Sequence, residues 1–256
     1  MHISNVDLYR DLLKEKAGIV LGADKAYLLE SRLTPVAQKW QFKSIDVMSM
    51  ALRGVAEPDL IKDVVEAMAV SETFFFRDVK PFLTLRDDIL PSLTKKKKIR
   101  IWCAGAASGQ EPYSIAMLLK DKGCTAEIIG TDISTTILDE ARRGDYSQAD
   151  VQRGLPVQML MTYFQQKGTS WILKDDIKKM VTFKYFNLLD SMGQMGTFDL
   201  IFCRHVLCHF EDKTRTDVLM RLSLQLADGG YLFLGKGETT DILPAADGKP
   251  GLFVKS

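Results

Sequence analysis

The segment IRIWCAGAASGQEPYSIAMLLKDKG (residues 99–123) places an apolar run, a turn with two glycines and a helix-like stretch in direct succession. The apolar run IRIWCAG (99–105) predicts a strand, and EPYSIAMLLKDKG (111–123) predicts a helix. The next two segments, AEIIGTD (126–132) and STTILDEARRG (134–144), repeat this pattern of strand and helix. Such alternation is typical of a parallel sheet covered by helices, so the sequence predicts an α/β fold.

Segments further along the chain extend the same sheet. FDLIFCRHV (198–206) predicts a central strand, and DKTRTDVLMRLSLQLADGG (212–230) predicts a helix that ends at the glycines. YLFLG (231–235) predicts another strand, and the tail GLFVKS (251–256) predicts a last antiparallel edge strand. Residues 151–186 break the alternation, because a helical RGLPVQMLMTYF precedes the strand-like pieces SWIL and MVTFKYF. We therefore expect a small inserted β-subdomain there.

Residues 1–72 lack strand-like alternation and predict a small, all-helical N-terminal domain. Apolar residues with helical spacing follow Asp24, a candidate N-cap; they are Leu29, Leu33, Val36 and Trp40. Residues 73–98 are expected to link this domain to the sheet domain of residues 99–256. The three phenylalanines at 74–76 are expected in the core between the two domains, because aromatic side chains dominate buried contact area.

Charge and composition exclude several classes of protein. The chain has 256 residues, 46% of them apolar, and its net charge is +1, with 34 Lys and Arg against 33 Asp and Glu. A chain with so little net charge lacks the field that drives non-specific binding to nucleic acid or membranes. The N-terminus lacks the apolar region of a signal peptide, and no stretch approaches about eighteen consecutive apolar residues. The four cysteines form no CxxC pair, so we expect a cytoplasmic protein with reduced cysteines and no metal site.

The turn GAASG (105–109) and the residue that ends the next strand predict a nucleotide-like ligand. Glycines between a strand and a helix let the backbone approach a ligand closely. Asp132 lies about 20 residues beyond Gly109, the offset at which an acidic residue meets a ribose hydroxyl. The spacing is not GxGxxG, so an ordinary tight turn and a capping role for Asp132 stay open. No GxxxxGK[ST] motif is present, which favours a ligand with a ribose and no phosphates, such as S-adenosylmethionine.

Five motifs resemble those of the CheR-type chemotaxis receptor methyltransferases, in the same order and spacing. They are SETFFFR (71–77), WCAGAASGQEPYSIAM (102–117), GTDIS (130–134), FNLLD (186–190) and FCRHVLCHF (202–210). The small helical N-terminal domain, the RGLP-containing insertion and the closing GGYLFLGKGE fit the same family, so the resemblance covers essentially the whole chain.

The resemblance implies transfer of a methyl group from S-adenosylmethionine to glutamate side chains on the cytoplasmic helices of chemoreceptors. The products are glutamyl methyl esters and S-adenosylhomocysteine, and the process is chemosensory adaptation. The implied fold is a Rossmann-like methyltransferase domain with a small inserted β-subdomain, preceded by a helical domain that docks on the receptor. A glutamate carboxylate has a pKa of about 4.3, so at pH 7 it needs no general base to attack a methyl group. Neither nucleic acid nor membrane insertion nor a metal is implied.

The resemblance also assigns nine cofactor-binding residues. They are Ser71, Thr73, Arg77, Glu111, Asp132, Asn187, Leu188, Arg204 and His205. By this assignment Glu111 lies near the methionine or ribose end of the cofactor, and Asp132 binds the ribose. Asn187 and Leu188 line the adenine. Ser71, Thr73 and Arg77 correspond to the family's Asn, Thr and Arg, which reach across from the helical domain.

Two residues are candidates for a catalytic role, Arg77 and His209. Arg77 is expected to orient the substrate carboxylate, because a guanidinium binds carboxylate oxygens in a defined geometry. Where the family usually has RNVLIYF, this chain has RHVLCHF, so His205 replaces an asparagine and His209 a tyrosine. A histidine at 209 that titrates near neutral pH would make activity depend on pH, whereas a packed histidine would not.

Lys25, Arg32 and Lys39 recur every seven residues and are expected to share one helix face. Receptor methylation helices are acidic, so this face is a candidate for receptor docking; a merely solvated face is the alternative. The short loop in YFQQKGTSWIL (163–173) indicates independence from a C-terminal receptor pentapeptide. Two other functions stay open: methylation of another protein or a small molecule, and a catalytically silent cofactor-binding module that signals by protein contact.

Overall fold

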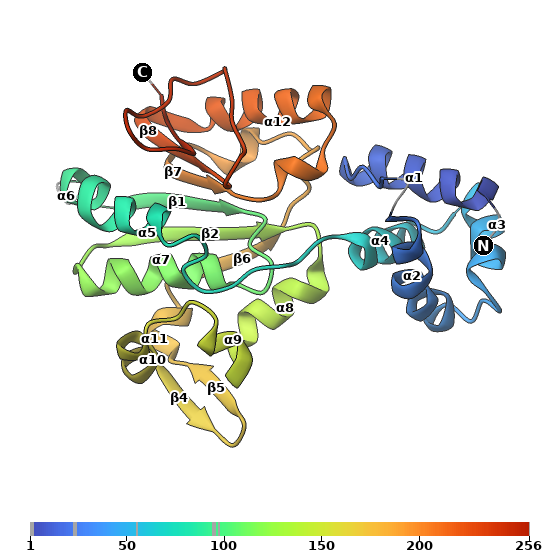
Figure 1. Cartoon of the computed structure of the whole chain (residues 1–256), viewed down its shortest axis with the longest axis horizontal. Helices are drawn as coiled ribbons and strands as arrows, with labels where there is room; N and C mark the ends of the chain where they lie inside the picture. Colours follow the sequence, from blue (N-terminus) through green and yellow to red (C-terminus); the bar gives the residue numbers. More distant parts are fainter. Residues whose placement is uncertain (1–2, 23–24, 55, 94–95, 97, 256) are drawn as a thin grey trace.

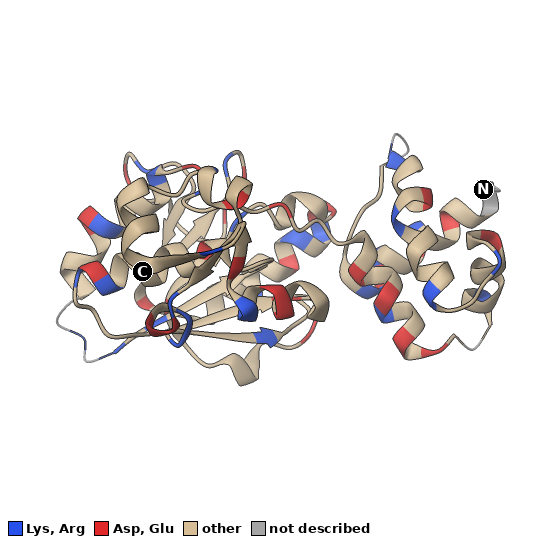
Figure 2. Ribbon diagram, turned by 90° about the horizontal axis from the view of Figure 1, so that it is seen from below, with Lys and Arg blue, Asp and Glu red and all other residues tan. Residues whose placement is uncertain are grey.

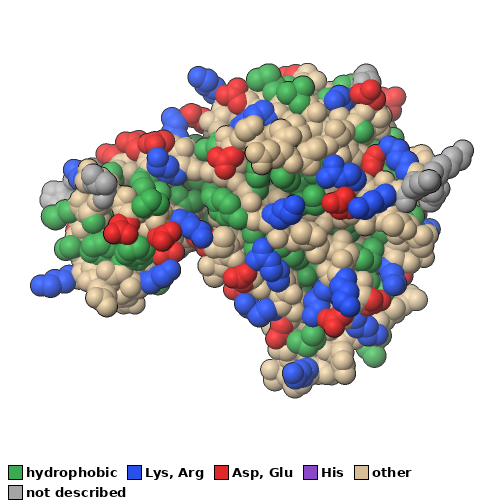
Figure 3. Space-filling view, turned by 180° about the vertical axis from the view of Figure 1, so that it is seen from behind, with side chains coloured by type: hydrophobic (Ala, Val, Ile, Leu, Met, Phe, Trp, Pro, Cys, Tyr) green, Lys and Arg blue, Asp and Glu red, His purple; other side chains and the backbone are tan. Residues whose placement is uncertain are grey.

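The computed structural model describes residues 3–22, 25–54, 56–93, 96 and 98–255. A helical N-terminal part stands beside a larger part built on a twisted sheet (Figure 1). Hydrophobic side chains gather where the two parts meet, on the face shown in Figure 3. Within the described residues, no helix is long and apolar enough to cross a membrane.

The N-terminal part consists of helices around a core of their own. They are α1 (Ile3–Ala17), α2 (Tyr27–Lys39), α3 (Ile45–Arg53) and α4 (Pro58–Met68). Leu29, Leu33 and Val36 of α2 are buried in this core, as their spacing predicts, and Trp40 packs against it. Asp24, the candidate N-cap, lies outside the described residues, and α2 begins at Tyr27. Ser44 caps α3 instead, where its hydroxyl accepts a hydrogen bond from the N–H of Val47.

The segment expected to be a linker contains helices. After an extended stretch come α5 (Lys80–Thr84), the π-helical turn η2 (Leu85–Ile89) and α6 (Leu90–Leu93). Phe82, Leu85 and Ile89 are buried in a core of the sheet part, so this region belongs to that part rather than to a flexible connection. Phe75 and Phe76 lie in the same core, which corrects the expectation that they fill the space between the domains.

The main sheet has six strands in the order β6-β2-β1-β7-β8-β9. Their bounds are β1 (Ile99–Ala104), β2 (Ala126–Asp132), β6 (Val181–Tyr185), β7 (Phe198–Cys203), β8 (Leu226–Leu234) and β9 (Leu252–Val254). All neighbours pair in parallel except β8 and β9, which confirms the mostly parallel sheet and the antiparallel last strand.

Successive residues of the central strand β1 face two different cores. Ile101 and Cys103 face the core that includes α7 (Gln110–Asp121) and α8 (Thr135–Arg143). Trp102 and Ala104 face the core that includes α12 (Asp212–Leu224). Helices therefore cover both faces of the sheet (Figure 1), as expected for parallel strands that are apolar throughout.

The glycines expected to end the last helix lie in a strand instead. Helix α12 ends at Leu224, and β8 already begins at Leu226. A Cβ on Gly230 would lie 2.8 Å from the carbonyl oxygen of Ala227 and 3.1 Å from that of Asp199. The register between β7 and β8 also shifts here. The glycine thus serves a close approach of backbones at an irregular strand, a role that sequence pattern does not distinguish from a helix end.

A second, antiparallel sheet forms the insertion, with the order β3-β5-β4. Its elements are β3 (Asp145–Ser147), α9 (Gln148–Gln152), α10 (Val157–Tyr163), β4 (Phe164–Lys167), β5 (Ser170–Leu173) and α11 (Asp175–Lys178). The expected bounds of 151–186 are wrong at both ends. The small sheet already starts at Asp145, and the strand at 181–185 is β6 of the main sheet, where it pairs with β2. Two short 3-10 turns complete the fold, η3 (Gly193–Met195) and η4 (Leu207–His209).

Candidate active site

A cavity lies at the carboxyl ends of β1, β2, β6 and β7, where parallel sheets bind ligands. Asp132 ends β2, and Gly105, Phe186 and Arg204 each follow directly on the last residue of a strand. The helical part closes the other side with Ala17 and Ile19. A segment from Ala69 to Arg77, extended at first and turning from Phe75 onward, crosses the opening. Most of the expected site residues line this cavity: Thr73, Arg77, Glu111, Asp132, Asn187, Leu188, Arg204, His205 and His209.

The turn after β1 needs its first glycine. Gly105 has a φ of 87°, and a Cβ there would lie 2.4 Å from Cγ2 of Val206. The backbone of this turn can therefore come close to the loop after β7 only without a side chain at 105. Ala107 also has a positive φ, 46°, an uncommon conformation for a residue other than glycine. Such strain persists only where the surroundings fix it, and it is concentrated at functional sites.

Asp132 holds this turn in place. One of its carboxylate oxygens accepts a hydrogen bond from the N–H of Ala107 at 2.9 Å, and the other accepts one from the N–H of Ser134 at 3.0 Å. Burial raises the pKa of Asp132, and these two backbone hydrogen bonds oppose the rise. Each carboxylate oxygen can accept a further hydrogen bond, so Asp132 can also bind ligand hydroxyls.

A buried arginine joins three separate segments at the other end of the cavity. Arg204 is 6% exposed, and its guanidinium binds the carboxylates of Glu111 and Asp78, both at 2.7 Å. It also donates to the backbone carbonyl of Arg77 at 2.7 Å. Its Nε is buried and has no acceptor within the described part of the chain. A charged donor without a partner is costly in the interior, so the guanidinium depends on its two carboxylates and the Arg77 carbonyl to offset its burial.

Two carboxylates that the sequence analysis did not identify fix His205. Nε2 of its ring lies 2.7 Å from a carboxylate oxygen of Asp78, and its backbone N–H donates to Glu238 at 2.9 Å. Glu238 also accepts from the N–H groups of Gly235 and Cys208, so one side chain anchors the whole loop after β7. His205 itself has a φ of 59°, another strained position at the cavity.

The segment over the cavity directs one predicted cofactor residue away from it. Val70, Glu72 and Thr73 line the cavity, but Ser71 does not. Ser71 lines an adjoining groove between α2, α4 and the start of α8, so the structure does not bring it to the cavity with the other predicted cofactor residues. The guanidinium of Arg77 donates to the carbonyl of Glu72 at 2.6 Å, which bends the segment at the cavity mouth.

Asn187 connects the cavity to the helical part. Its amide nitrogen donates to the carbonyl of Lys16 at the end of α1, at 2.7 Å. Its amide oxygen accepts from the N–H of Leu189 at 3.0 Å. Leu188 is buried in the core beside α12 and contributes an apolar wall. Asn187 thus acts in domain contact as well as in the cavity wall.

His209 is half-buried, and its environment disfavours a charge. Burial lowers the pKa of its ring below 6.5, and the nearby Lys25 lowers it further. Of the two alternatives for His209, the lowered pKa favours the packed histidine, which is neutral at pH 7, over one that titrates near neutral pH. Its backbone carbonyl accepts from the N–H of Val20 at 2.8 Å, a second bond between the two parts of the molecule.

The three cations of the expected docking face do not form a stripe of free charges. The guanidinium of Arg32 donates to the carbonyls of Met68 and Ala69 at 3.2 and 3.1 Å, and Lys39 pairs with Asp63 at 2.7 Å. Lys25 precedes α2 and is exposed. In Figure 2, Lys and Arg are mixed with Asp and Glu over the helical part. Receptor docking on this face stays a prediction.

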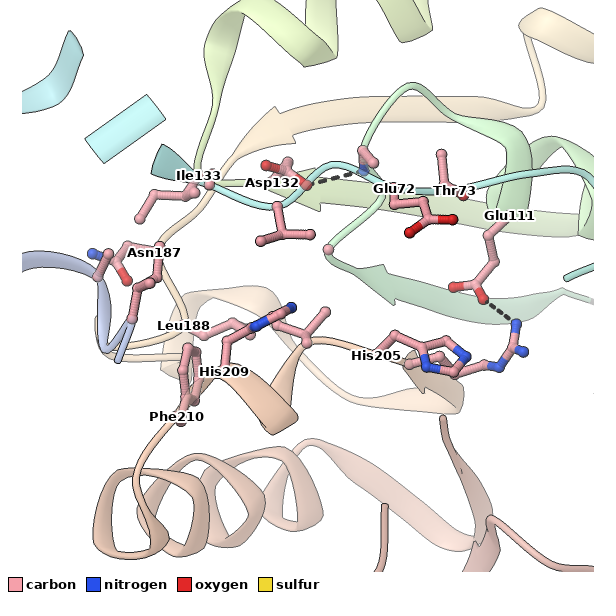
Figure 4. Close-up of a pocket in the computed structure, with 18 of the residues that line it drawn as sticks. Glu72, Thr73, Glu111, Asp132, Ile133, Asn187, Leu188, His205, His209 and Phe210 are labelled. Carbon is pink, nitrogen blue, oxygen red and sulfur yellow. Dashed lines mark hydrogen bonds and ion pairs between the residues drawn. The ribbon is translucent and has the colours of Figure 1, made fainter. Parts of the chain in front are cut away.

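The cavity has an apolar end and an acidic end (Figure 4). Leu188 and Phe210 lie at the first, whereas Glu72 and Glu111 reach into the second opposite His205. S-adenosylmethionine has an aromatic adenine at one end and carries positive charge on its sulfonium and ammonium groups at the other, so the wall matches it in polarity and charge. No group of three or more His, Cys, Asp or Glu side chains suited to a metal ion occurs among the residues described.

Two family models match the chain and together span most of it. The model described as "CheR methyltransferase, SAM binding domain" matches residues 71–246, and "CheR methyltransferase, all-alpha domain" matches residues 5–68. The boundary between the two matches falls where α4 ends and the extended segment over the cavity begins.

Curated relatives resemble the chain over nearly its full length. The chemotaxis protein methyltransferase Cher2 of Pseudomonas putida is 36% identical over 95% of this chain and 94% of the relative. Chemotaxis protein methyltransferase 1 of Pseudomonas aeruginosa is 38% identical over 95% of this chain and 94% of its own. The chemotaxis protein methyltransferase of Vibrio parahaemolyticus is 38% identical over 96% of both chains.

Proposed function

Since the chain belongs to the CheR methyltransferase family and is an S-adenosylmethionine-dependent methyltransferase, we propose that it methylates glutamate side chains on the cytoplasmic helices of chemoreceptors. The product on the receptor is a glutamyl methyl ester, and the reaction serves adaptation in chemotaxis. The observation that carries the proposal is a cavity lined by all the candidate cofactor and catalytic residues except Ser71.

The chain's own residues account for how the cofactor is held. Asp132 accepts hydrogen bonds from the ribose hydroxyls, and Asn187 with Leu188 lines the adenine. Arg204 lines the cavity at its acidic end, where its positive charge attracts the carboxylate of the methionine end. Glu111 balances the positive charge there while it keeps Arg204 in place at 2.7 Å. When bound, the cofactor supplies an electrophilic methyl group on a sulfonium.

The reaction needs a positioned carboxylate more than a base. A receptor glutamate is ionised at neutral pH, so no proton has to be removed before its oxygen attacks. Arg77 lines the cavity and orients this carboxylate. His209 is neutral at pH 7 because its pKa is lowered, so it does not draw the carboxylate into an ion pair. Catalysis then rests on proximity and alignment within a cavity that the extended segment partly closes.

The test combines labelled S-adenosylmethionine with receptor cytoplasmic fragments and measures base-labile label released as methanol. The proposal predicts release by the wild type, loss of release in Arg77→Ala, and normal release in Arg215→Gln, a partly exposed arginine of α12 paired with Asp212. Cofactor binding without any methanol release would contradict the proposal and favour another substrate or a silent binding module.

We also propose that the enzyme works without a receptor pentapeptide. Only residues 168 and 169 separate β4 from β5, so the insertion has a tight turn where a peptide-docking loop would need length. Calorimetry with a receptor C-terminal pentapeptide should detect no binding at micromolar concentrations. Submicromolar affinity would overturn this.

A further inference from the structure

An aromatic side chain at the cavity mouth lies between two guanidinium groups. Cζ of Arg153 is 4.2 Å from the centre of the Phe74 ring, and Cζ of Arg77 is 5.5 Å from it. Arg77 is one of the expected site residues, whereas Arg153 comes from the insertion, just after α9, and no role is assigned to it. Two cations that share one ring are held close to each other at a fixed place.

The insertion is fixed against the extended segment at this point. Gly154 has a φ of 87°, and a Cβ there would lie 2.1 Å from the carbonyl oxygen of Phe75. Phe75 in turn packs edge-to-face on Tyr146 and Phe164 of the small sheet. Arg153 is therefore presented beside the cavity by a rigid turn rather than by a loose loop.

A carboxylate of the chain itself already sits among these cations. One oxygen of Glu72 is 2.7 Å from a guanidinium nitrogen of Arg153. The hydrogen bond and charge of Arg153 lower the pKa of Glu72, and the charges of Arg77 and His205 lower it further. Glu72 also lines the cavity, where it points inward beside Thr73 and opposite His205 (Figure 4).

We propose that the guanidinium groups of Arg153 and Arg77 together bind the carboxylate of the substrate glutamate. In the free enzyme the carboxylate of Glu72 occupies the position that the substrate carboxylate takes. The inference rests on the proposed function, because it takes a glutamate carboxylate as the substrate. Glu72 has the same functional group as that substrate and lies within reach of the same cations. The Arg153 and Glu72 side chains are 55% and 57% exposed, and such exposed pairs open at little cost. An incoming carboxylate can therefore exchange with Glu72.

Through Arg153 the insertion takes part in binding the substrate glutamate. This contribution does not require a receptor pentapeptide. A guanidinium offers two parallel N–H donors to a carboxylate. Arg153 can therefore release the carboxylate of Glu72 and donate the same hydrogen bonds to the receptor glutamate.

Steady-state kinetics with receptor fragments tests the proposal, alongside calorimetry with S-adenosylhomocysteine. Arg153→Gln should raise the KM for the receptor about 5- to 10-fold, as expected for loss of one charged contact, and leave cofactor affinity within about twofold. Glu72→Gln should lower that KM about two- to threefold, because the competing carboxylate is gone. The receptor KM of Arg153→Lys should lie between those of the wild type and Arg153→Gln, because lysine keeps the positive charge but lacks the two parallel N–H donors. Arg215→Gln is the matched control and should equal the wild type.

Three outcomes overturn the inference in different ways. An unchanged receptor KM in Arg153→Gln, with an active wild type, would remove Arg153 from substrate binding and leave the proposed function standing. A weaker cofactor affinity in Glu72→Gln, with an unchanged KM, would make Glu72 a cofactor ligand instead. A wild type that releases no methanol from any receptor fragment would remove both the inference and the function on which it rests.

Discussion

Asp132 has one role in the fold, where it holds the turn after β1, and one in the proposed site, where it binds the ribose. It ends β2, and its carboxylate holds the backbone of the glycine turn through Ala107. Its place was predictable from sequence, because the end of a parallel strand fixes where the side chain lies. Glu72, Asp78 and Glu238 were not predictable in this way. Their contacts join segments far apart in the chain, and no local pattern records them.

Replacing Asp132 by asparagine should weaken binding of S-adenosylhomocysteine about 10- to 100-fold, the loss expected for charged hydrogen bonds to a ribose. Isothermal calorimetry measures the change. Asp139→Asn is the matched control, since Asp139 is exposed on α8 and pairs only with a surface arginine among the contacts described. Equal affinity in Asp132→Asn and Asp139→Asn would show that Asp132 only caps and shapes the turn.

The methylation rate should stay level from pH 7 to 8.5 and decline only below pH 6.5. His209 has its pKa lowered by burial and by Lys25, so it is neutral over the upper range and gains a proton as the pH falls. A charged His209 would pair with the substrate carboxylate and reduce its reactivity. In His209→Tyr this contribution to the decline should disappear. Initial methylation rates at saturating substrate, measured across this pH range, test the prediction. A wild-type rate that already declines above pH 7 would refute the assignment of a neutral His209.

At the scale of elements, one carboxylate ties the helical part to the sheet part. Glu66 of α4 accepts hydrogen bonds from the N–H and hydroxyl groups of Thr135 and Thr136 at the start of α8, and from the hydroxyl of Ser134. An anion at a helix N-terminus satisfies free N–H groups and meets the positive end of the helix dipole. This contact orients the two parts on either side of the cavity.

Glu66→Gln should lower the free energy of unfolding by about 1–2 kcal/mol at pH 7, the loss expected for a charged helix cap. Burial raises the pKa of Glu66, but the hydrogen bonds from Thr135 and Thr136 lower it by more, so it lies below 4.5. The stability it adds is therefore present above pH 4.5 and is lost as the pH falls through the lowered pKa.

Urea unfolding of Glu66→Gln and wild type at pH 7 and at pH 4 tests this, with Glu140→Gln, an exposed residue of α8, as the control. The two curves should differ at pH 7 and approach each other at pH 4. A difference that grows on acidification would contradict the assigned cap.

The local pattern of apolar residues predicted most helices and strands correctly. It failed for elements whose position depends on contacts between distant segments. The strands at 99–104 and 126–132 and the helices that follow them lie where apolar spacing places them. Strand β6 was assigned to the insertion because its membership in the main sheet depends on pairing with β2, which no local signal shows. The end of α12 was misplaced because glycines occur both at helix ends and in irregular strands.

On the scale of the whole molecule, the cavity is shared between two parts that each have a core of their own. Asn187 binds the end of α1, the carbonyl of His209 accepts from Val20, and Glu66 caps α8. The sequence predicted two parts and the family's chemistry, but not these bonds, which set how the helical part closes the cavity. Substrate recognition, as we propose it, adds a third element, the insertion with Arg153.

The most direct test of the central claim is tandem mass spectrometry of a receptor cytoplasmic fragment after incubation with the enzyme and heavy-methyl S-adenosylmethionine. The account predicts a heavy methyl ester on glutamate residues of the receptor helices, removed by mild base and absent with Arg77→Ala. A heavy methyl group on nitrogen or sulfur, or on no receptor residue while the cofactor binds, would contradict it.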